Sequence, residues 1–141
     1  MASAERTETF DAPVANIYKV LTNYEAYPDF MDGVKEVKEL SRDGNTAIVE
    51  YNLNIIKKFT YTVKITEVEN ESLSWTFEGG DLFNSNDGSW TLKDNGDGTT
   101  EVTYKLDLDF KVKVPGLMAK KLASSSLPSM MKSVCKKAKS L

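Results

Sequence analysis

The side chains that could carry chemistry in this 141-residue chain are tyrosine hydroxyls, carboxylates, lysines and one cysteine, because the sequence contains no histidine. The absence of histidine excludes the Ser-His-Asp and Cys-His nucleophile systems and an ordinary Cys/His zinc site. The cysteine, Cys135, neighbours the apolar stripe of a predicted helix, and we interpret it as a small hydrophobic residue. We therefore expect no catalytic residue, no metal and no cofactor. These absences favour a binding protein over an enzyme without deciding between them.

Two asparagines share a strand phase with large apolar residues and are candidates for contact with a ligand. If Trp90 and Leu92 face the interior, a spacing of two also turns Asn86 and Asn84 inward. Gly88 lies on the same phase, between Asn86 and Trp90. A buried amide is costly unless it is hydrogen-bonded. Asn86 is therefore expected either to orient a ligand carbonyl or hydroxyl, or to bond the backbone near the end of its strand.

Aromatic residues are concentrated on the phase that is expected to be dry. Three of them, Tyr51, Tyr61 and Tyr104, either offer hydroxyls to a ligand or extend their tips to water. The dry face carries more rings than one helix easily covers. Two interpretations stay open from this pattern: the rings line a cavity for an apolar ligand, or they fill the core.

Alternation of apolar and polar residues predicts that most of the chain forms strands joined by short turns. Sequential strands of this kind indicate an antiparallel meander with one wet face and one dry face. The glycines and the asparagine in residues 94–98 are typical of a hairpin turn. The expected strands cover residues 4–10, 34–40, 47–55, 59–66, 73–77, 83–93 and 102–112.

Helical spacing of apolar residues predicts a helix from residue 14 to about residue 22 and another over residues 127–141. Between them, Pro28 forbids a long regular helix, so we expect a short helix or turn that presents Tyr24, Tyr27 and Phe30. The C-terminal helix is the only long element available to cover the dry face. Its predicted apolar stripe consists of Leu127, Met130, Met131, Val134, Ala138 and Leu141.

The length and the charge distribution constrain the class of protein further. A chain of this length is expected to form a single domain over residues 1–141. No signal peptide or membrane-spanning apolar run is evident, and one cysteine cannot form an internal disulfide, so we expect a cytoplasmic protein. The net charge is −3, yet eight lysines and no acid follow Phe110. This basic segment indicates either a solvated helix face or a transient contact with a membrane surface or another protein; the acidic remainder argues against DNA binding.

Four segments of the sequence resemble the START-like (helix-grip, SRPBCC) superfamily, and within it the bacterial polyketide cyclase/dehydrase and coenzyme Q-binding group. The most specific of their motifs are Tyr24-Glu-Ala-Tyr-Pro-Asp-Phe30 and Gly88-Ser-Trp90. The resemblance implies an α+β helix-grip fold, with a curved antiparallel sheet of about seven strands around a long C-terminal helix and two short helices after the first strand. It also implies a cavity for lipids, quinones or polyketides. The segments are DAPVANIYKVLTNYEAYPDFMDGVKEVKEL, WTFEGGDLFNSNDGSWTL, GDGTTEVTYKLDLDF and VPGLMAKKLASSSLPSMMKSV.

From the pattern and the resemblance together we predict a non-catalytic protein that binds or transports a small hydrophobic ligand. One alternative is a cyclase or dehydratase, which would need a proton donor such as an interior tyrosine, Glu50 or Glu78. Glu50 lies on a polar strand phase and Glu78 follows a strand end, so both are weak candidates. A second alternative is a protein- or ribosome-interacting module that uses the basic C-terminal helix. The predicted ligand-binding residues are Tyr24, Tyr27, Phe30, Tyr51, Tyr61, Trp75, Asn86, Trp90, Tyr104, Met118, Leu122 and Met131.

Overall fold

The computed structural model describes residues 2–29, 34–54, 58–111, 113 and 127–141. One strand opens the chain, two helical segments follow, and six further strands lead to a C-terminal helix. The helical segments are α1 (Val14–Thr22), the 3-10 helix η1 (Tyr24–Asp29) and α3 (Leu127–Lys139). The strands are β1 (Ala2–Phe10), β2 (Val34–Asp43), β3 (Thr46–Asn54), β4 (Lys58–Val68), β5 (Ser72–Gly80), β6 (Phe83–Asp94) and β7 (Thr100–Phe110).

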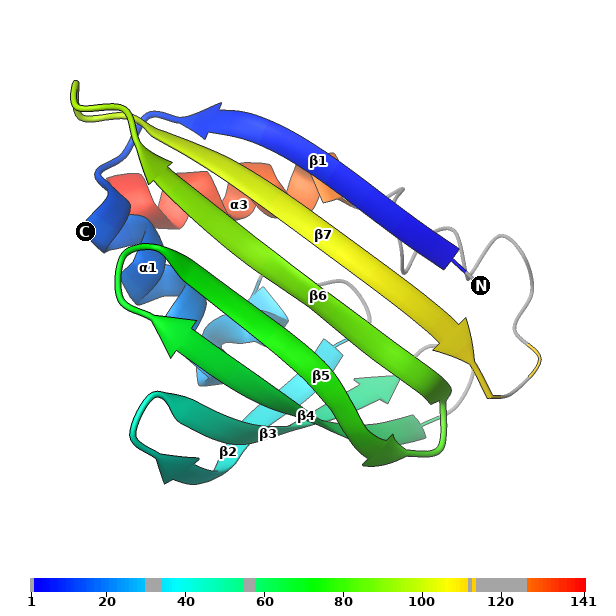
Figure 1. The fold of residues 1–141 in the computed structure, drawn as a ribbon. Coiled ribbons are helices and arrows are strands. Elements are labelled where there is room, and N and C mark those ends of the chain that lie inside the picture. Colours follow the sequence, from blue (N-terminus) through cyan, green and yellow to red (C-terminus); the bar gives the residue numbers. More distant parts are fainter. Residues whose placement is uncertain (1, 30–33, 55–57, 112, 114–126) are drawn as a thin grey trace.

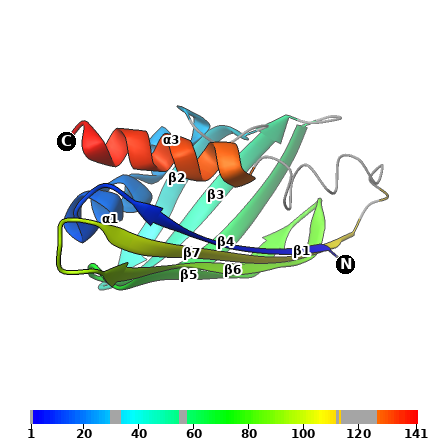
Figure 2. The same ribbon diagram turned by 90° about the horizontal axis from the view of Figure 1, so that it is seen from above.

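The seven strands form one antiparallel sheet in the order β1-β7-β6-β5-β4-β3-β2. Strands β2 to β7 follow one another as a meander, and β1 closes the order by pairing with β7. The sheet curves, and the helical segments lie together on its inner side (Figures 1 and 2). The predicted helix-grip fold, with two short helices after the first strand, is confirmed.

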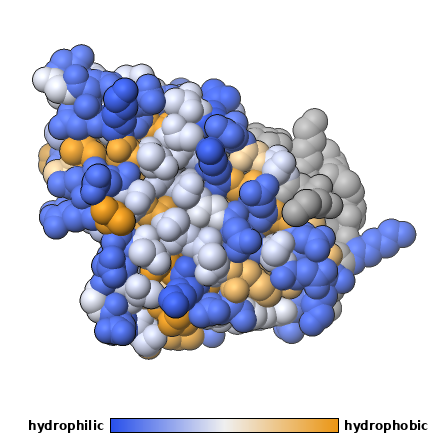
Figure 3. All heavy atoms as spheres, in the orientation of Figure 1, coloured by the Kyte–Doolittle hydropathy of each residue, from blue (hydrophilic) through white to orange (hydrophobic). Residues whose placement is uncertain are grey.

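The two faces of the sheet differ as the alternation predicts. Along β4, Phe59, Tyr61, Val63 and Ile65 are buried, and the residues between them are exposed or half-buried. Because neighbouring side chains of a strand point to opposite faces, one face can be packed while the other meets water. The outer face is covered mainly by hydrophilic and weakly polar side chains (Figure 3).

Helix α3 packs against α1 and the inner side of the sheet through part of its predicted stripe. Met131, Val134 and Ala138 are fully buried, and Met130 is half-buried against the core. The side-chain amide of Asn16 on α1 donates a hydrogen bond to the Ala138 carbonyl at 3.2 Å. Among the described residues, no helix is long and apolar enough to cross a membrane.

Two expectations about inward-facing residues are wrong at the ends of elements. Leu141 is 60% exposed, because α3 ends at Lys139 and the last residue no longer follows the helical stripe. Asn84 is exposed, because a register shift between Phe83 and Ser85 interrupts the pairing of β6 with β7. The bulge turns Phe83 inward in place of Asn84.

Candidate functional site

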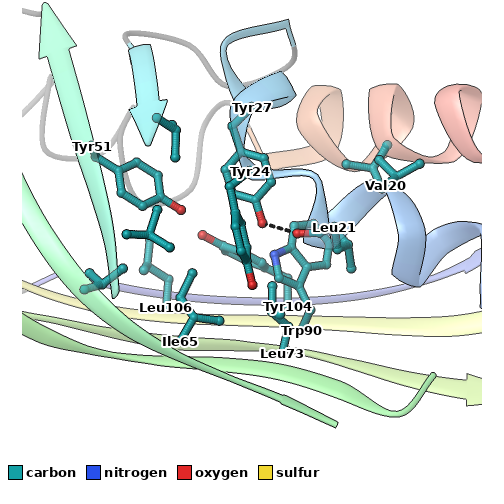
Figure 4. Packing of buried hydrophobic residues seen from close by; sticks show 14 of the residues in the cluster. Val20, Leu21, Tyr24, Tyr27, Tyr51, Ile65, Leu73, Trp90, Tyr104 and Leu106 are labelled. Atoms are coloured by element: carbon teal, nitrogen blue, oxygen red, sulfur yellow. Dashed lines mark hydrogen bonds between the residues drawn. The ribbon is translucent and has the colours of Figure 1, made fainter. Parts of the chain in front are cut away.

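Four tyrosines from four elements lie in the interior between the sheet and the helices. They are Tyr27 on η1, Tyr51 on β3, Tyr61 on β4 and Tyr104 on β7, and we call them the tyrosine cluster; all four are buried. Tyr51 and Tyr61 stand opposite each other in the β3–β4 register, and their rings stack with centroids 4.9 Å apart. The Tyr27 ring lies 6.1 Å from that of Tyr51. The side chains of Tyr27, Tyr51 and Tyr104 project into the same region (Figure 4).

Further aromatic rings hold the cluster on the side of the sheet. Trp90 meets Tyr104 edge to face with ring centroids 4.6 Å apart, and Trp75 lies 6.0 Å from the same tyrosine. Phe83 meets Tyr61 edge to face at 5.0 Å. Such ring pairs add geometric preference to the apolar burial. The two tryptophans of the chain therefore both border the tyrosine cluster.

Trp75 reaches this position because its strand partner is a glycine. Trp75 pairs directly with Gly88 on β6. A Cβ at Gly88 would lie 2.4 Å from Cζ2 of the indole and 2.5 Å from the Lys105 carbonyl oxygen. Only a residue without a side chain leaves room for the ring there.

Asn86 faces inward, as predicted, and its amide is engaged by neighbouring side chains. The Trp75 indole Nε1 donates a hydrogen bond to Asn86 Oδ1 at 3.1 Å. The Asn86 amide also hydrogen-bonds Tyr61. Asn86 thus connects β5 and β4 through side chains, and not through the backbone contact that the sequence also allowed.

Two hydroxyls of the tyrosine cluster differ from the rest of the buried polar groups. Within the described part of the chain, every fully enclosed side-chain nitrogen or oxygen has a hydrogen-bond partner. The hydroxyls of Tyr51 and Tyr104 have none among these residues, so each must border space that a water molecule can reach. The two hydroxyls point toward one another from β3 and β7 (Figure 4).

Burial keeps the cluster in its protonated form. Desolvation raises the pKa of Tyr51 well above its ordinary value, and the neighbouring Tyr27, Tyr61 and Tyr104 add to the shift. Desolvation also raises the pKa of Tyr104 and of Tyr61, and the hydrogen bond from Asn86 opposes the rise at Tyr61. At neutral pH these hydroxyls are hydrogen-bond donors and very weak acids.

A polar network anchors η1 to the sheet beside the tyrosine cluster. The Tyr24 hydroxyl donates a hydrogen bond to Glu67 on β4. Arg42 on β2 donates to both oxygens of the same carboxylate, at 3.0 and 2.9 Å, and to Glu39 at 2.7 Å. Burial alone would raise the pKa of Glu67, but the hydrogen bonds from Arg42 and Tyr24 outweigh it and hold the pKa below its ordinary value. The network fixes the segment that carries Tyr27.

Glu67 was not predicted as a site residue, although the sequence contains a signal for its burial. Glu67 lies in the same alternating phase as Tyr61, Val63 and Ile65, which are buried. An acid on a buried phase needs a cationic or hydrogen-bonding partner. Continuing the phase by one more residue would have identified it.

The other predicted site residues are placed as follows. Met131 lies fully buried on α3, and Tyr24 is buried with its hydroxyl bound to Glu67. Phe30, Met118 and Leu122 lie outside the described residues. The weak acid candidates do not join the cluster, since Glu78 is exposed and Glu50 is half-buried on the opposite phase.

The described residues form no cluster of metal ligands, and some of the lysines on α3 are paired with acids of the same molecule. Among them, no three His, Cys, Asp or Glu side chains gather as metal ligands would. On α3, Lys137 forms an ion pair with Asp29 at 3.3 Å and Lys139 one with Asp11 at 3.6 Å. Part of the basic character of α3 therefore serves contacts within the molecule, and a membrane or protein contact through this helix stays a prediction.

The chain matches one protein family model, and several solved structures have the same fold. The family model described as polyketide cyclase / dehydrase and lipid transport matches residues 10–135. No curated protein has a significant sequence match to the chain. A START superfamily protein from Mycobacterium smegmatis is 22% identical with a TM-score of 0.80, and the match covers 98% of this chain and 97% of that one.

Two further solved structures have the same fold at lower identity. A protein from Thermus thermophilus is 16% identical with a TM-score of 0.82, over 99% of this chain and 98% of that one. The Zhui aromatase/cyclase from a Streptomyces species is 17% identical with a TM-score of 0.68, over 99% of this chain and 87% of that one. At these identities the likeness concerns the fold, and the activity in a neighbour's name does not transfer.

Proposed function

The chain belongs to the polyketide cyclase/dehydrase and lipid transport family, and from that premise we propose that it binds a small hydrophobic molecule between its sheet and its helices, without transforming it. One observation carries the proposal: Tyr51 and Tyr104 are more than nine-tenths buried among apolar rings, and yet their hydroxyls have no hydrogen-bond partner among the described residues. Because neither hydroxyl is fully enclosed by the described residues, water can satisfy both in the absence of a ligand. A ligand oxygen would take the place of that water.

Apolar contact would supply most of the affinity. Burying about 400 Å² of apolar surface is worth roughly 10 kcal/mol at 25 cal/mol per Å². Part of this gain is offset by the freedom that the ligand loses, so we expect a Kd in the micromolar range. One or two hydrogen bonds to tyrosine would orient the ligand and add less to the total.

The chemistry of the interior favours binding over catalysis. A cyclase or dehydratase mechanism calls for a group that transfers protons near neutral pH. The tyrosines of the cluster have raised pKa values, because they are buried, and this makes them poor proton donors. Glu67, the one buried carboxylate among the described residues, is held in its charged form by Arg42 and Tyr24.

The test is native mass spectrometry of the freshly purified protein, followed by organic extraction of anything that it releases. Calorimetric titration with a panel of lipids, quinones and polyketide-like aromatics completes it. We expect either a co-purifying molecule or micromolar binding to at least one member of the panel. A mass equal to that of the chain alone, together with no binding across the panel, would contradict the proposal and favour rings that simply fill the core.

For the location we propose the cytoplasm, as the single cysteine suggests. Fractionation of the producing cells with an antibody to this chain checks it. Recovery in the secreted or membrane fraction would contradict this location without affecting the binding proposal.

A further inference from the structure

We propose that the molecule bound in the interior is uncharged and presents one hydroxyl or carbonyl oxygen to the hydroxyls of Tyr51 and Tyr104. The inference rests on the proposed binding function and narrows it to a chemical class. It predicts phenols, alcohols and ketones with an apolar body as ligands, and it predicts discrimination against fatty acids and other carboxylates.

In the part of the chain that the structure describes, no buried side chain carries a positive charge that could pair with an anionic ligand. Among the described residues, the buried polar or charged side chains are Glu67, Asn86 and Thr100. Glu67 is negative and already paired with Arg42. A carboxylate placed beside the tyrosine cluster would lose its hydration without gaining a cation, and burial of an unpaired ion is strongly unfavourable.

The remaining polar groups of the interior are already committed. Asn86 accepts from Trp75 and bonds Tyr61, and Thr100 donates to the Ala12 carbonyl at 2.9 Å. Among the buried side chains described, the hydroxyls of Tyr51 and Tyr104 have no protein hydrogen-bond partner, and they remain open to water or to a ligand. A hydroxyl both donates and accepts, so a ligand alcohol, phenol or ketone oxygen can bond either of them.

The two hydroxyls are held in place before any ligand arrives. The Tyr51 ring stacks on Tyr61 with an angle of 6° between the ring planes, and the Tyr104 ring is fixed edge to face by Trp90. Figure 4 shows the labelled side chains of Tyr51 and Tyr104 with their hydroxyls directed toward one another. Groups that are already oriented lose little freedom on binding, which makes them effective in selecting a ligand oxygen.

The experiment compares three ligands that share the naphthalene ring and differ in one substituent: 2-naphthol, naphthalene and 2-naphthoate. Calorimetry at pH 7.5 gives the Kd of each for the wild-type chain and for the Tyr51→Phe, Tyr104→Phe and Tyr18→Phe variants. Tyr18 on α1 is the matched control, because it is half-buried and lies outside the cluster. Thermal unfolding of each variant verifies that the fold is retained, since the substitution keeps the ring and removes one oxygen.

We expect wild type to bind 2-naphthol about 10-fold more tightly than naphthalene, and 2-naphthoate more weakly than either. Tyr51→Phe and Tyr104→Phe should each remove most of the preference for 2-naphthol, while Tyr18→Phe keeps it. Equal binding of 2-naphthol and naphthalene, tighter binding of 2-naphthoate, or an unchanged preference in both cluster variants would overturn the inference and leave the proposed function standing. Failure of all three ligands and of the whole lipid panel would instead refute the proposed function.

Discussion

Replacement of Gly88 by alanine should destabilise the protein, because the new methyl group has no room. Its Cβ would lie 2.4 Å from Cζ2 of Trp75 and 2.5 Å from the Lys105 carbonyl oxygen. Carbon atoms in ordinary contact are about 3.5–4.0 Å apart, so the indole or the backbone of β7 must move by about 1 Å. Moving the indole also disturbs its 3.1 Å hydrogen bond to Asn86.

The size of the effect follows from three contributions. Overpacking costs about 1–3 kcal/mol, and loss of the indole hydrogen bond about 1 kcal/mol. Alanine restricts the unfolded chain and returns about 0.4–1 kcal/mol. We therefore expect Gly88→Ala to lower the free energy of unfolding by about 1–3 kcal/mol.

Urea denaturation of wild type, Gly88→Ala and Gly79→Ala measures this loss. Gly79 on β5 is the matched control, because a Cβ there meets nothing within 4 Å. The control should change the free energy of unfolding by no more than about 0.5 kcal/mol in either direction. If Gly88→Ala were as stable as Gly79→Ala, the close approach of Trp75 to the β6 backbone would be refuted.

Three other perturbations test the rest of the structure. Glu67→Gln should cost about 1–3 kcal/mol in urea denaturation, because the charge that binds Arg42 and Tyr24 is lost; a loss below about 0.5 kcal/mol would contradict the network. The folded state lowers the pKa of Glu67 from its ordinary 4.5, so its contribution is complete above that pH and is lost as the pH falls through the folded pKa. Between about pH 5 and pH 2 wild type should therefore lose more stability than Glu67→Gln, and parallel losses would contradict that shift. Met131→Ala should lower the free energy of unfolding by about 2–5 kcal/mol because Met131 is fully buried, whereas Met130→Ala should lower it clearly less. If thermal unfolding shows equal losses of stability for the two variants, the packing of the Met131 face of α3 against the core would be contradicted.

The strands and α1 could be predicted because their burial follows local periodicity. The alternating run over residues 102–112 corresponds to β7, which ends at Phe110, and the helix expected over residues 14–22 corresponds to α1. In such elements, each side chain's neighbours along the chain are enough to tell the inner face from the outer one.

The details that depend on pairing between strands could not be predicted in the same way. The bulge that exposes Asn84 is a property of how β6 meets β7, and alternation along β6 alone cannot detect it. The contact of Trp75 with Gly88 likewise arises from the β5–β6 register. Glu67 is an intermediate case. Its burial could be predicted from the alternation along β4, but its partners on β2 and η1 could not, because they are distant in sequence.

The sequence predicted which residues belong to the candidate site, but not how their side chains contact and hydrogen-bond one another. Tyr51, Tyr61 and Tyr104 were expected on the dry face, and they are buried there. Which hydroxyls are already bonded could not be foreseen, since that depends on Asn86 and Trp75 meeting across strands. The distinction decides the proposal, because the unbonded hydroxyls of Tyr51 and Tyr104 carry it.

The most direct test of ligand binding at the tyrosine cluster is an NMR titration of the protein with its six tyrosines isotopically labelled in the ring. Tyrosine-to-phenylalanine variants assign the signals, and 2-naphthol is added to saturation as followed by calorimetry. The account predicts that the ring signals of Tyr51 and Tyr104 change most and that those of Tyr18 on α1 stay in place. Saturable binding that leaves Tyr51 and Tyr104 unchanged would contradict it, as would a complete absence of binding.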